Sequence, residues 1–364
     1  MLTEAPFLVY SKRDREIWEQ RLTGSFLVAT LAVLLGGLTE GSFLFPMKLV
    51  KRWTWENVWL VYSVAGLLVM PWIAAIWTIP HLTDVYASVP TKTLLLTALF
   101  GFGWGVANVL FGSAVPRMGM ALSFAIVVGM SASLGCLVPL ILSNPARLGK
   151  PSGMMVLGGV CLTCVGIVLL GIAGRARERA QSNQIQPQPS GSSSNMKVGL
   201  LLCLISGLLA PMLNYSFIFG SPIGAEAIAH GAPKGQAANA VWAIALLGGL
   251  LGNGGFAVIQ LIRNRTWSHF GRGERLRPYL LSASMGFLFT AGLFLYGWGA
   301  MGLGDLGAAV GWPIFQSVMI ILSSGIGIAT GEWRGTAPRI FRMNVAGLLV
   351  LLGAILLLSY GNRA

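Results

Sequence analysis

The stretch from Gly119 to Leu142, GMALSFAIVVGMSASLGCLVPLIL, contains no charged residue. A transmembrane helix needs about 20 consecutive, mostly apolar residues, so this stretch is long enough to cross a bilayer. Soluble domains usually carry about 25% charged residues, whereas this chain is 10% charged and 55% hydrophobic. The sequence therefore predicts an integral membrane protein that folds with lipid as its solvent.

Nine further stretches of the same character lie on either side of it. The predicted spans are 24–46, 57–79, 94–115, 119–142, 153–173, 197–219, 238–262, 278–302, 305–329 and 340–360. Two links are very short, at Pro116-Arg117 and at Gly304-Asp305, so the spans that they join should be antiparallel neighbours. We therefore predict an all-α integral membrane fold with ten transmembrane helices.

A polar segment at 181–195, QSNQIQPQPSGSSSN, divides the chain into two halves of five spans each. It has no apolar face to bury, which is typical of a flexible linker. The predicted parts are a polar N-terminal tail at 1–23, a first five-helix repeat at 24–173, a linker at 174–196, a second five-helix repeat at 197–360 and a tail at 361–364. Because each half has an odd number of spans, halves of one fold would form inverted repeats.

The net charge of +13 comes from basic residues in short segments between the apolar runs. No basic stripe with interleaved aromatic residues is present, so we do not expect nucleic-acid binding. Fifteen Lys or Arg residues lie in the odd-numbered loops and four in the even-numbered loops. The positive-inside rule then predicts cytoplasmic odd-numbered loops and both termini outside, although four basic residues in the N-terminal tail favour the opposite orientation.

The sequence lacks the usual marks of catalysis. No G-x-x-x-x-G-K-[ST] motif is present, so ATP is not expected to drive transport from this chain. Cys161 and Cys164 form a C-x-x-C without a second pair or a nearby histidine, which favours packing over metal binding. His81, His230 and His269 all lie in predicted loops. We therefore predict no enzymatic activity, no cofactor and no metal.

Glu40 is the one carboxylate well inside a predicted span, late in the first one. An intramembrane ionisable residue is costly and is a functional candidate for that reason. An apolar setting favours the neutral form of a carboxyl group, so Glu40 could bind and release a proton during transport. The alternative is a structural carboxylate near the helix end, which reaches water or pairs with Lys48.

Four carboxamide side chains lie within four different predicted spans. They are Asn108, Asn214, Asn253 and Gln316. A carboxamide both donates and accepts hydrogen bonds, which suits the hydroxyl groups of a sugar. The alternative for each is a structural hydrogen bond between helices.

Tryptophans next to glycines form a second group of candidates, Trp104, Trp298 and Trp312. An indole can stack on the apolar face of a sugar ring and donate one hydrogen bond, although membrane tryptophans more often anchor the chain at the interface. Trp53, Trp55 and Trp59 fit that anchor role, and Glu56 beside them should face the positive end of the second span.

Glycines four residues apart form two pairs, Gly101 with Gly105 and Gly327 with Gly331. Each pair is predicted to allow close approach of a neighbouring helix.

Residues 43–56, FLFPMKLVKRWTWE, resemble the first loop of the L-rhamnose–proton symporter family, within the drug/metabolite transporter superfamily. The similarity extends over nearly all of 24–360. The matching positions are Phe43, Pro46, Lys48, Val50, Lys51, Trp53, Trp55, Glu56, Pro71, Trp72, Gly103 to Gly105, Asn108, Gly112, Gly119, Met120, Gly129, Ala225 to Asn253, Tyr296, Trp298, Gly299, Trp312, Glu332 and Trp333.

This resemblance implies ten helices in two five-helix repeats and uptake of a deoxy sugar together with a proton. The expected protein is a proton-coupled importer of L-rhamnose or a similar 6-deoxyhexose in the bacterial cytoplasmic (inner) membrane. Glu40 would carry the proton, and Asn108, Asn214, Asn253, Gln316, Trp104 and Trp312 would contact the sugar. The assignment of Glu40 comes from the physical argument and not from the resemblance. The alternative is a metabolite or drug exporter of the same superfamily.

Overall fold

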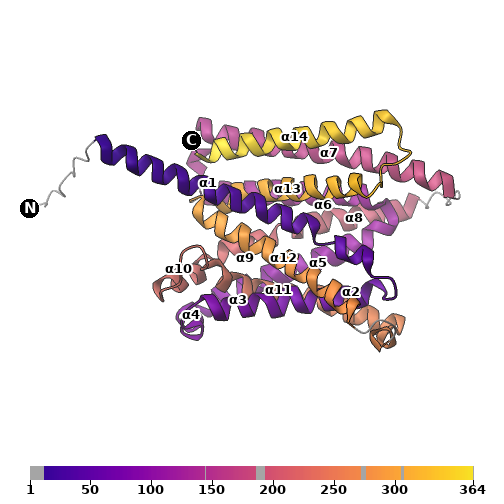
Figure 1. Ribbon diagram of the computed structural model, residues 1–364, viewed down its shortest axis with the longest axis horizontal. Helices are drawn as coiled ribbons and strands as arrows, with labels where there is room; N and C mark the ends of the chain where they lie inside the picture. Colours follow the sequence, from indigo (N-terminus) through magenta and orange to yellow (C-terminus); the bar gives the residue numbers. More distant parts are fainter. Residues whose placement is uncertain (1–11, 144, 186–192, 272–275, 305–306, 364) are drawn as a thin grey trace, which may run out of the picture.

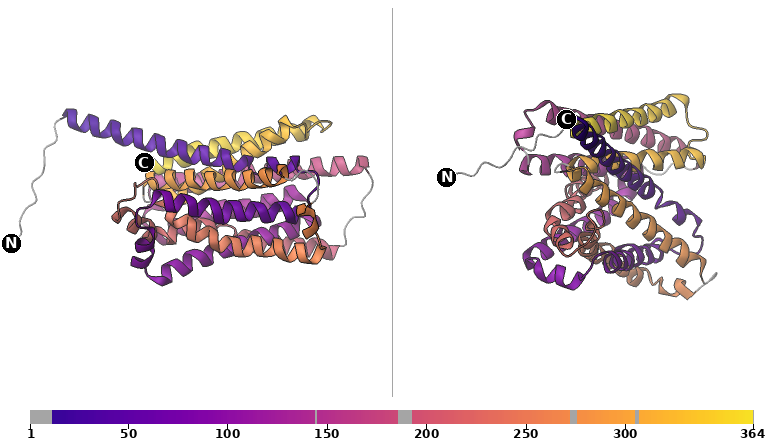
Figure 2. Two further views of the ribbon diagram at one scale, coloured as in Figure 1. Left: turned by 60° about the horizontal axis from the view of Figure 1, so that its bottom comes forward. Right: turned by 60° about the vertical axis from the view of Figure 1, so that its left-hand side comes forward.

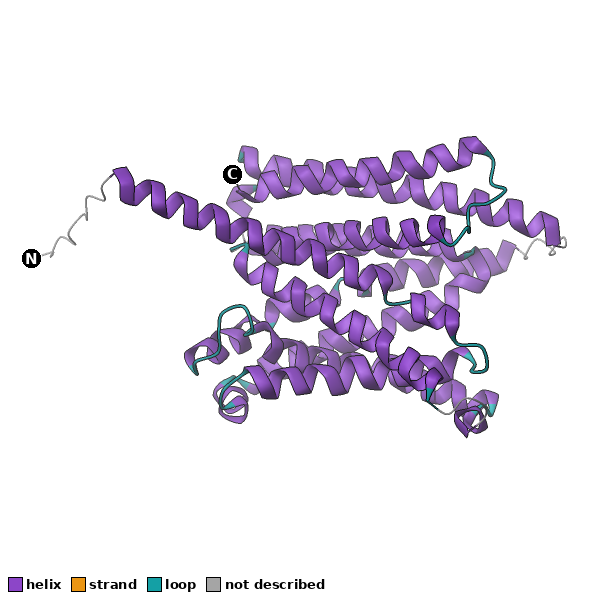
Figure 3. Cartoon of the chain, in the orientation of Figure 1, coloured by secondary structure: helices purple, strands orange, loops and turns teal. Residues whose placement is uncertain are grey.

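The computed structural model describes residues 12–143, 145–185, 193–271, 276–304 and 307–363. Every regular element in these ranges is helical, as Figure 3 shows. The predicted N-terminal tail, apart from residues 12–23, and Asp305 of the second short link lie outside the described residues.

The first half of the chain contains five spans. Its elements are α1 (Lys12–Ser42), η1 (Phe45–Leu49), α2 (Trp55–Val64), η2 (Ala65–Val69), α3 (Met70–Thr78), α4 (Leu82–Ser88), α5 (Thr91–Met118), α6 (Met120–Ser143), η3 (Pro145–Arg147) and α7 (Pro151–Ile185). The second span is continuous through α2, the π-helical turn η2 and α3.

The second half also contains five spans. Its elements are α8 (Ser193–Leu209), α9 (Met212–Phe219), α10 (Ser221–Ala229), α11 (Ala238–Asn264), η4 (Trp267–Gly271), α12 (Arg277–Gly302), α13 (Gly307–Ala329) and α14 (Pro338–Arg363). The sixth span is built from α8, α9 and α10.

Within the described residues, ten helical segments are long and apolar enough to cross a membrane, which confirms the predicted number of spans. They run roughly side by side in Figures 1 and 2. The described start of α1 and the end of α14 lie at the same end of the molecule (Figure 1). We call this the even-loop end and the opposite one the odd-loop end, after the numbers of the loops found there.

Helix α1 has one exposed apolar face and one buried face. Leu27, Leu31 and Leu35 are four residues apart and exposed, whereas Ala32 and Val33 are buried. Residues four apart lie on the same face of a helix. Such an apolar outer stripe suits a hydrocarbon environment.

Glycines set the closest helix contacts. A Cβ atom added to Gly105 on α5 would lie 2.7 Å from the carbonyl oxygen of Gly249 on α11, so the pair Gly101 and Gly105 behaves as predicted. On α1, a Cβ added to Gly36 would lie 2.7 Å from the carbonyl oxygen of Gly292 on α12. Both helix pairs approach so closely because a side chain is absent.

The second predicted glycine pair has a different role, so that prediction is wrong. Gly331 has a φ of +80° and ends α13 instead of facing a neighbouring helix. The amide of Glu332 donates to the carbonyl of Gly327 at 2.9 Å, and that of Gly331 donates to Ile328 at 3.1 Å. This is the hydrogen-bond pattern of a Schellman motif with glycine at the left-handed position.

The spans follow a regular order of neighbours. Span one packs on spans eight and nine (α1 on α12 and α13), and span six packs on spans three and four (α8 on α5 and α6). Span three packs on span seven (α5 on α11), and span eight packs on span two (α12 on α2). Span five packs on span ten (α7 on α14), side by side at the top of Figure 1.

The structure differs from the predicted spans and linker in three places. Span six continues to Ala229 instead of ending at 219, and it is broken around Pro211, which cannot donate a helical hydrogen bond. The linker predicted at 174–196 is helical in part, because α7 continues to Ile185 and α8 begins at Ser193. Between spans two and three, α4 forms a short helix that the sequence pattern did not indicate.

Glu56 lies in the first turn of α2, where a negative charge is favourable, as predicted. Its carboxylate also accepts hydrogen bonds from Thr266 Oγ1 at 2.7 Å and Asn264 Nδ2 at 3.1 Å. The start of span two is therefore tied to the end of span seven.

Candidate functional site

One group of predicted residues meets around Tyr296 on α12. The Tyr296 hydroxyl lies 2.5 Å from Asn214 Oδ1, and it is also 2.9 Å from the carbonyl oxygen of Ala308. Asn214 on α9 donates from Nδ2 to the carbonyls of Gly135 at 3.0 Å and Ala308 at 3.1 Å. Asn214 is fully buried and joins α6, α9, α12 and α13, which is the structural role left open for it.

Trp312 and Gln316, one turn apart on α13, extend this group. Trp312 Nε1 donates to the carbonyl of Ser131 at 3.2 Å, and Gln316 Nε2 lies 3.2 Å from Ser131 Oγ. The ring of Trp312 packs edge-on against Tyr296 with 5.5 Å between centroids. We call Ser131, Asn214, Tyr296, Trp312 and Gln316 the carboxamide cluster.

A second group is mostly aromatic and lies about two turns earlier on α12, around Phe289. Phe289 packs against Phe43 and Tyr62, each with 5.8 Å between ring centroids, and stacks on Trp104 at 5.4 Å. Trp59 lies 4.8 Å from Tyr62. We call Phe43, Trp59, Tyr62, Trp104 and Phe289 the aromatic cluster; it joins α2, α5 and α12 to the end of α1.

The two remaining predicted carboxamides differ in their surroundings. Asn253 on α11 is buried and accepts from Trp59 Nε1 at 3.4 Å, so it borders the aromatic cluster. Asn108, one turn beyond Trp104 on α5, is half-buried and makes no side-chain hydrogen bond within the described part of the chain. The structure therefore brings the predicted residues into two neighbouring clusters and leaves Asn108 outside their hydrogen bonds.

Glu40 lies between the two clusters. A Cβ atom added to Gly292 on α12 would lie 3.1 Å from Glu40 Cβ. Gly292 stands one helical turn from Tyr296 and about one turn from Phe289, since a turn is about 3.6 residues. Phe43, which follows Glu40 by three residues, packs against Tyr62 with 5.7 Å between ring centroids.

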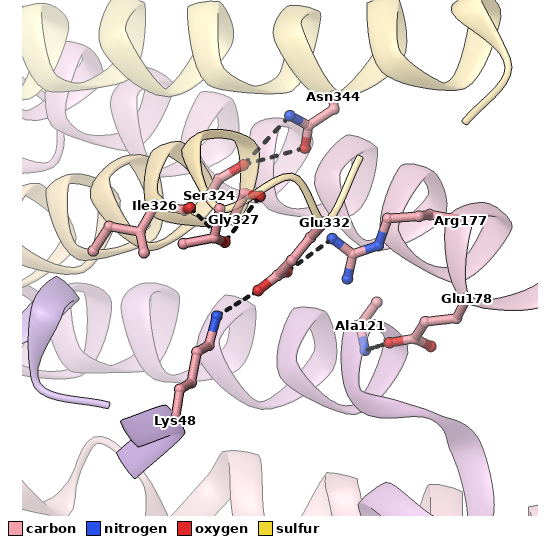
Figure 4. A network of polar contacts seen from close by, with 10 residues as sticks. Lys48, Ala121, Arg177, Glu178, Ser324, Ile326, Gly327, Glu332 and Asn344 are labelled. Atoms are coloured by element: carbon pink, nitrogen blue, oxygen red, sulfur yellow. Dashed lines mark hydrogen bonds and ion pairs between the residues drawn. The ribbon is translucent and has the colours of Figure 1, made fainter. Parts of the chain in front are cut away.

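Among the described residues, the carboxyl group of Glu40 takes part in no ion pair. Its Oε2 is buried and has no hydrogen-bond partner among the described residues. Lys48, the alternative partner considered from the sequence, donates instead to Glu332 Oε1 at 2.5 Å, as Figure 4 shows. An unpaired charge in such a position is costly, which makes Glu40 a site where a proton or a ligand group would be stabilising.

Two side chains near these clusters were not singled out from the sequence. Trp242 on α11 is fully buried, stacks on Phe217 at 4.9 Å and leaves Nε1 without a partner among the described residues. Phe289 lies seven residues, or about two turns, before Tyr296 on the same face of α12. Phe289 belongs to the aromatic cluster and Tyr296 to the carboxamide cluster. That spacing was the signal available in the sequence.

The histidines and cysteines do not form a site. His81 and His230 flank the short helices α4 and α10, and His269 lies in η4. Cys164 contacts Ser133 Oγ at 2.9 Å. No group of three or more metal-binding side chains comes together within the described residues.

The fold defines a class: a multi-pass, all-helical membrane protein with buried polar and aromatic side chains between its spans. A model of the L-rhamnose-proton symport protein (RhaT) family matches residues 23–363. The chain therefore belongs to this family, which is a family of transporters and not of enzymes.

Curated relatives agree with this membership. An L-rhamnose-proton symporter of Yersinia pestis is 25% identical over 350 residues, covering 94% of this chain and 100% of the relative. An L-rhamnose-proton symporter of Pectobacterium atrosepticum is 25% identical over 334 residues, covering 90% and 95% of the two chains.

Proposed function

We propose that this protein imports a small sugar together with a proton, and that the sugar is L-rhamnose or a similar 6-deoxyhexose. The relatives named for this activity cover nearly the whole chain and come from bacteria. A bacterial cytoplasmic membrane is the expected location.

The proposal depends on Glu40, which is the carboxylate that would take up the coupling proton. It lies half-buried between the carboxamide cluster and the aromatic cluster, and its Oε2 is buried without a partner among the described residues. A carboxyl group there is stabilised by protonation or by a ligand hydroxyl. Sugar and proton would therefore bind at neighbouring positions.

The chemistry of a 6-deoxyhexose fits the two clusters. Its hydroxyl groups would exchange hydrogen bonds with Asn108, Asn214, Asn253 and Gln316. Its methyl group and the apolar face of its ring would lie against Trp104 and Trp312. Asn214 already forms hydrogen bonds with Tyr296 and with two backbone carbonyls. A sugar that binds Asn214 must therefore displace one of these three partners.

Alternating access between two inverted five-helix repeats would move the sugar across the membrane. The order of neighbours supports this arrangement, since exchanging spans one to five with spans six to ten reproduces it. Span one on spans eight and nine corresponds to span six on spans three and four, and span three on span seven corresponds to span eight on span two. Spans five and ten, which pack on one another, would exchange places.

Uptake of labelled L-rhamnose by cells that produce the protein tests the proposal. We expect accumulation that collapses when a protonophore is added. Equal uptake in producing and control cells would refute the sugar assignment. Accumulation of solute inside inverted vesicles without uptake into cells would instead favour the exporter.

A further inference from the structure

Two neighbouring residues near the end of α7 reach different parts of the protein. Arg177 Nη1 lies 3.2 Å from Glu332 Oε2, whereas Glu178 Oε1 accepts a hydrogen bond from the backbone amide of Ala121 at 2.9 Å. Figure 4 shows the two side chains leaving α7 toward these partners. Both contacts lie at the odd-loop end.

The first contact reaches the group of spans formed by α1, α12 and α13. Glu332 follows α13 directly and also accepts the hydrogen bond from Lys48 in η1, which follows α1. The guanidinium of Arg177 lies 4.9 Å from the ring centroid of Trp333. The Schellman motif at Gly331 fixes the backbone of Glu332, so the carboxylate is presented by an ordered turn.

The second contact reaches the group formed by α5, α6 and α8. Ala121 lies in the first turn of α6, just after the tight turn at Gly119, whose φ is +86°. Helix N-termini favour a carboxylate acceptor because their first amides lack partners. Glu178 therefore caps α6, while its neighbour Arg177 contacts Glu332 in the group formed by α1, α12 and α13.

The two contacts differ in how easily they can break. α6 and α7 belong to the same half and pack closely: a Cβ atom added to Gly174 would lie 2.6 Å from Ala121 Cβ. The contact between Arg177 and Glu332 joins the two halves. The side chain of Glu332 is 38% exposed and that of Arg177 is 18% exposed. Water therefore reaches the carboxylate, and ion pairs with an exposed partner contribute little net free energy.

The hydrogen bond from Lys48, with help from Arg177, also lowers the pKa of Glu332 below its ordinary value of 4.5. The carboxylate is therefore charged at neutral pH.

We propose that Arg177 and Glu178 form a clamp that holds the odd-loop end closed, and that the contact of Arg177 with Glu332 breaks each time this end opens. This inference rests on the proposed alternating-access function and assigns a role to the last turns of α7. The weak ionic contact opens and closes, while Glu178 keeps α6 attached to α7.

The first test measures opening without any solute. Cys136 is fully buried on α6, beside Gly135, which contacts Asn214 and Trp312. In protein whose other three cysteines are replaced by alanine, we expect Glu332→Gln and Arg177→Gln each to raise the rate of Cys136 modification by a thiol reagent supplied at the odd-loop end about fivefold. Unchanged rates in both variants would overturn the clamp, whatever the transported solute is.

Glu226→Gln is the matched control. The side chain of Glu226 is 40% exposed, which resembles the exposure of Glu332. Its partner His230, at 3.9 Å, caps the same helix α10, so this contact joins no two groups of spans. This variant should leave Cys136 modification unchanged. A rise equal to that of Glu332→Gln would contradict a specific clamp.

The second test locks the contact. In a cysteine-free background, Arg177→Cys with Glu332→Cys should be cross-linked by a short bifunctional thiol reagent that a reductant cleaves. We expect loss of most labelled L-rhamnose uptake and its recovery after cleavage. Full uptake by cross-linked protein would overturn the clamp, whereas absence of uptake by the unsubstituted protein would count against the sugar and leave the Cys136 measurement to judge the clamp.

Discussion

Glu40 on α1 lies directly across from Gly292 on α12, where an added Cβ atom would come within 3.1 Å of the Glu40 Cβ. Gly292 also faces Gly36, whose carbonyl oxygen would lie 2.9 Å from that added atom. Because Gly292 has no side chain, the backbone of α12 packs directly against α1 beside Glu40. The position of Glu40 depends on this crossing.

Gly292→Ala should force α1 and α12 apart. Overpacking of this kind costs about 1–3 kcal/mol, so the melting temperature of the detergent-purified protein should fall. Gly325→Ala is the control, because nothing lies within 4 Å of its added Cβ. Equal melting temperatures for the two variants would show that the crossing is not tight.

Tyr296→Phe removes the hydroxyl that lies 2.5 Å from Asn214 Oδ1. A buried acceptor left without its donor costs about 1–3 kcal/mol, and we expect lower thermal stability together with a changed KM for uptake. Tyr360→Phe should change neither quantity, since Tyr360 is 63% exposed. Unaltered stability and KM in Tyr296→Phe would show that this hydroxyl is not part of the site.

Gln316→Leu tests whether the carboxamide cluster binds the sugar. The variant keeps the size of the side chain but loses its hydrogen bonds, so we expect KM for L-rhamnose to rise about tenfold, the effect of roughly 1.4 kcal/mol. Asn344→Leu removes another buried carboxamide, which contacts Ser324 outside both clusters. If both variants raise KM equally, the effect reports general damage and not sugar contact.

The clamp should not respond to pH near neutrality. Because the pKa of Glu332 is lowered by Lys48 and Arg177, its ionic contacts are complete above the ordinary carboxyl pKa and are lost only as the pH falls through the lowered value. The rate of Cys136 modification, divided by the rate in Glu332→Gln to cancel the pH dependence of the thiolate itself, should therefore be constant between about pH 6 and about pH 8, where glutamates of ordinary or lowered pKa stay ionised. A steep rise toward about pH 6 would mean that another group controls closure.

The ten spans could be predicted because each depends on a local property, a long run of apolar residues. The break of span six at Pro211 is also visible in the sequence, but the continuation to Ala229 depends on where α9 and α10 pack. The helical residues of α7 from 174 onward were expected as linker, since the polar segment that begins at 181 has no apolar face. They are held by Glu332 and Ala121, which are distant in sequence.

The sequence predicted several residues of the candidate site but not the contacts between them. Buried polarity within a span singled out Glu40, Asn214, Asn253 and Gln316 one at a time. The pairing of Lys48 with Glu332 joins residues 284 positions apart, and no local pattern favours it over a pair with Glu40. For the same reason the hydrogen bonds of Tyr296 and the stacking of Trp242 on Phe217 could not be predicted before the helices were packed together.

The most direct test of the account is Glu40→Gln, assayed in two ways in the same vesicles. We expect loss of accumulation of L-rhamnose driven by a proton gradient, while exchange of labelled for unlabelled sugar continues, because the carboxamide cannot bind and release the proton. Glu226→Gln should retain both activities. Undiminished proton-driven accumulation by Glu40→Gln would contradict the central claim that Glu40 carries the coupling proton.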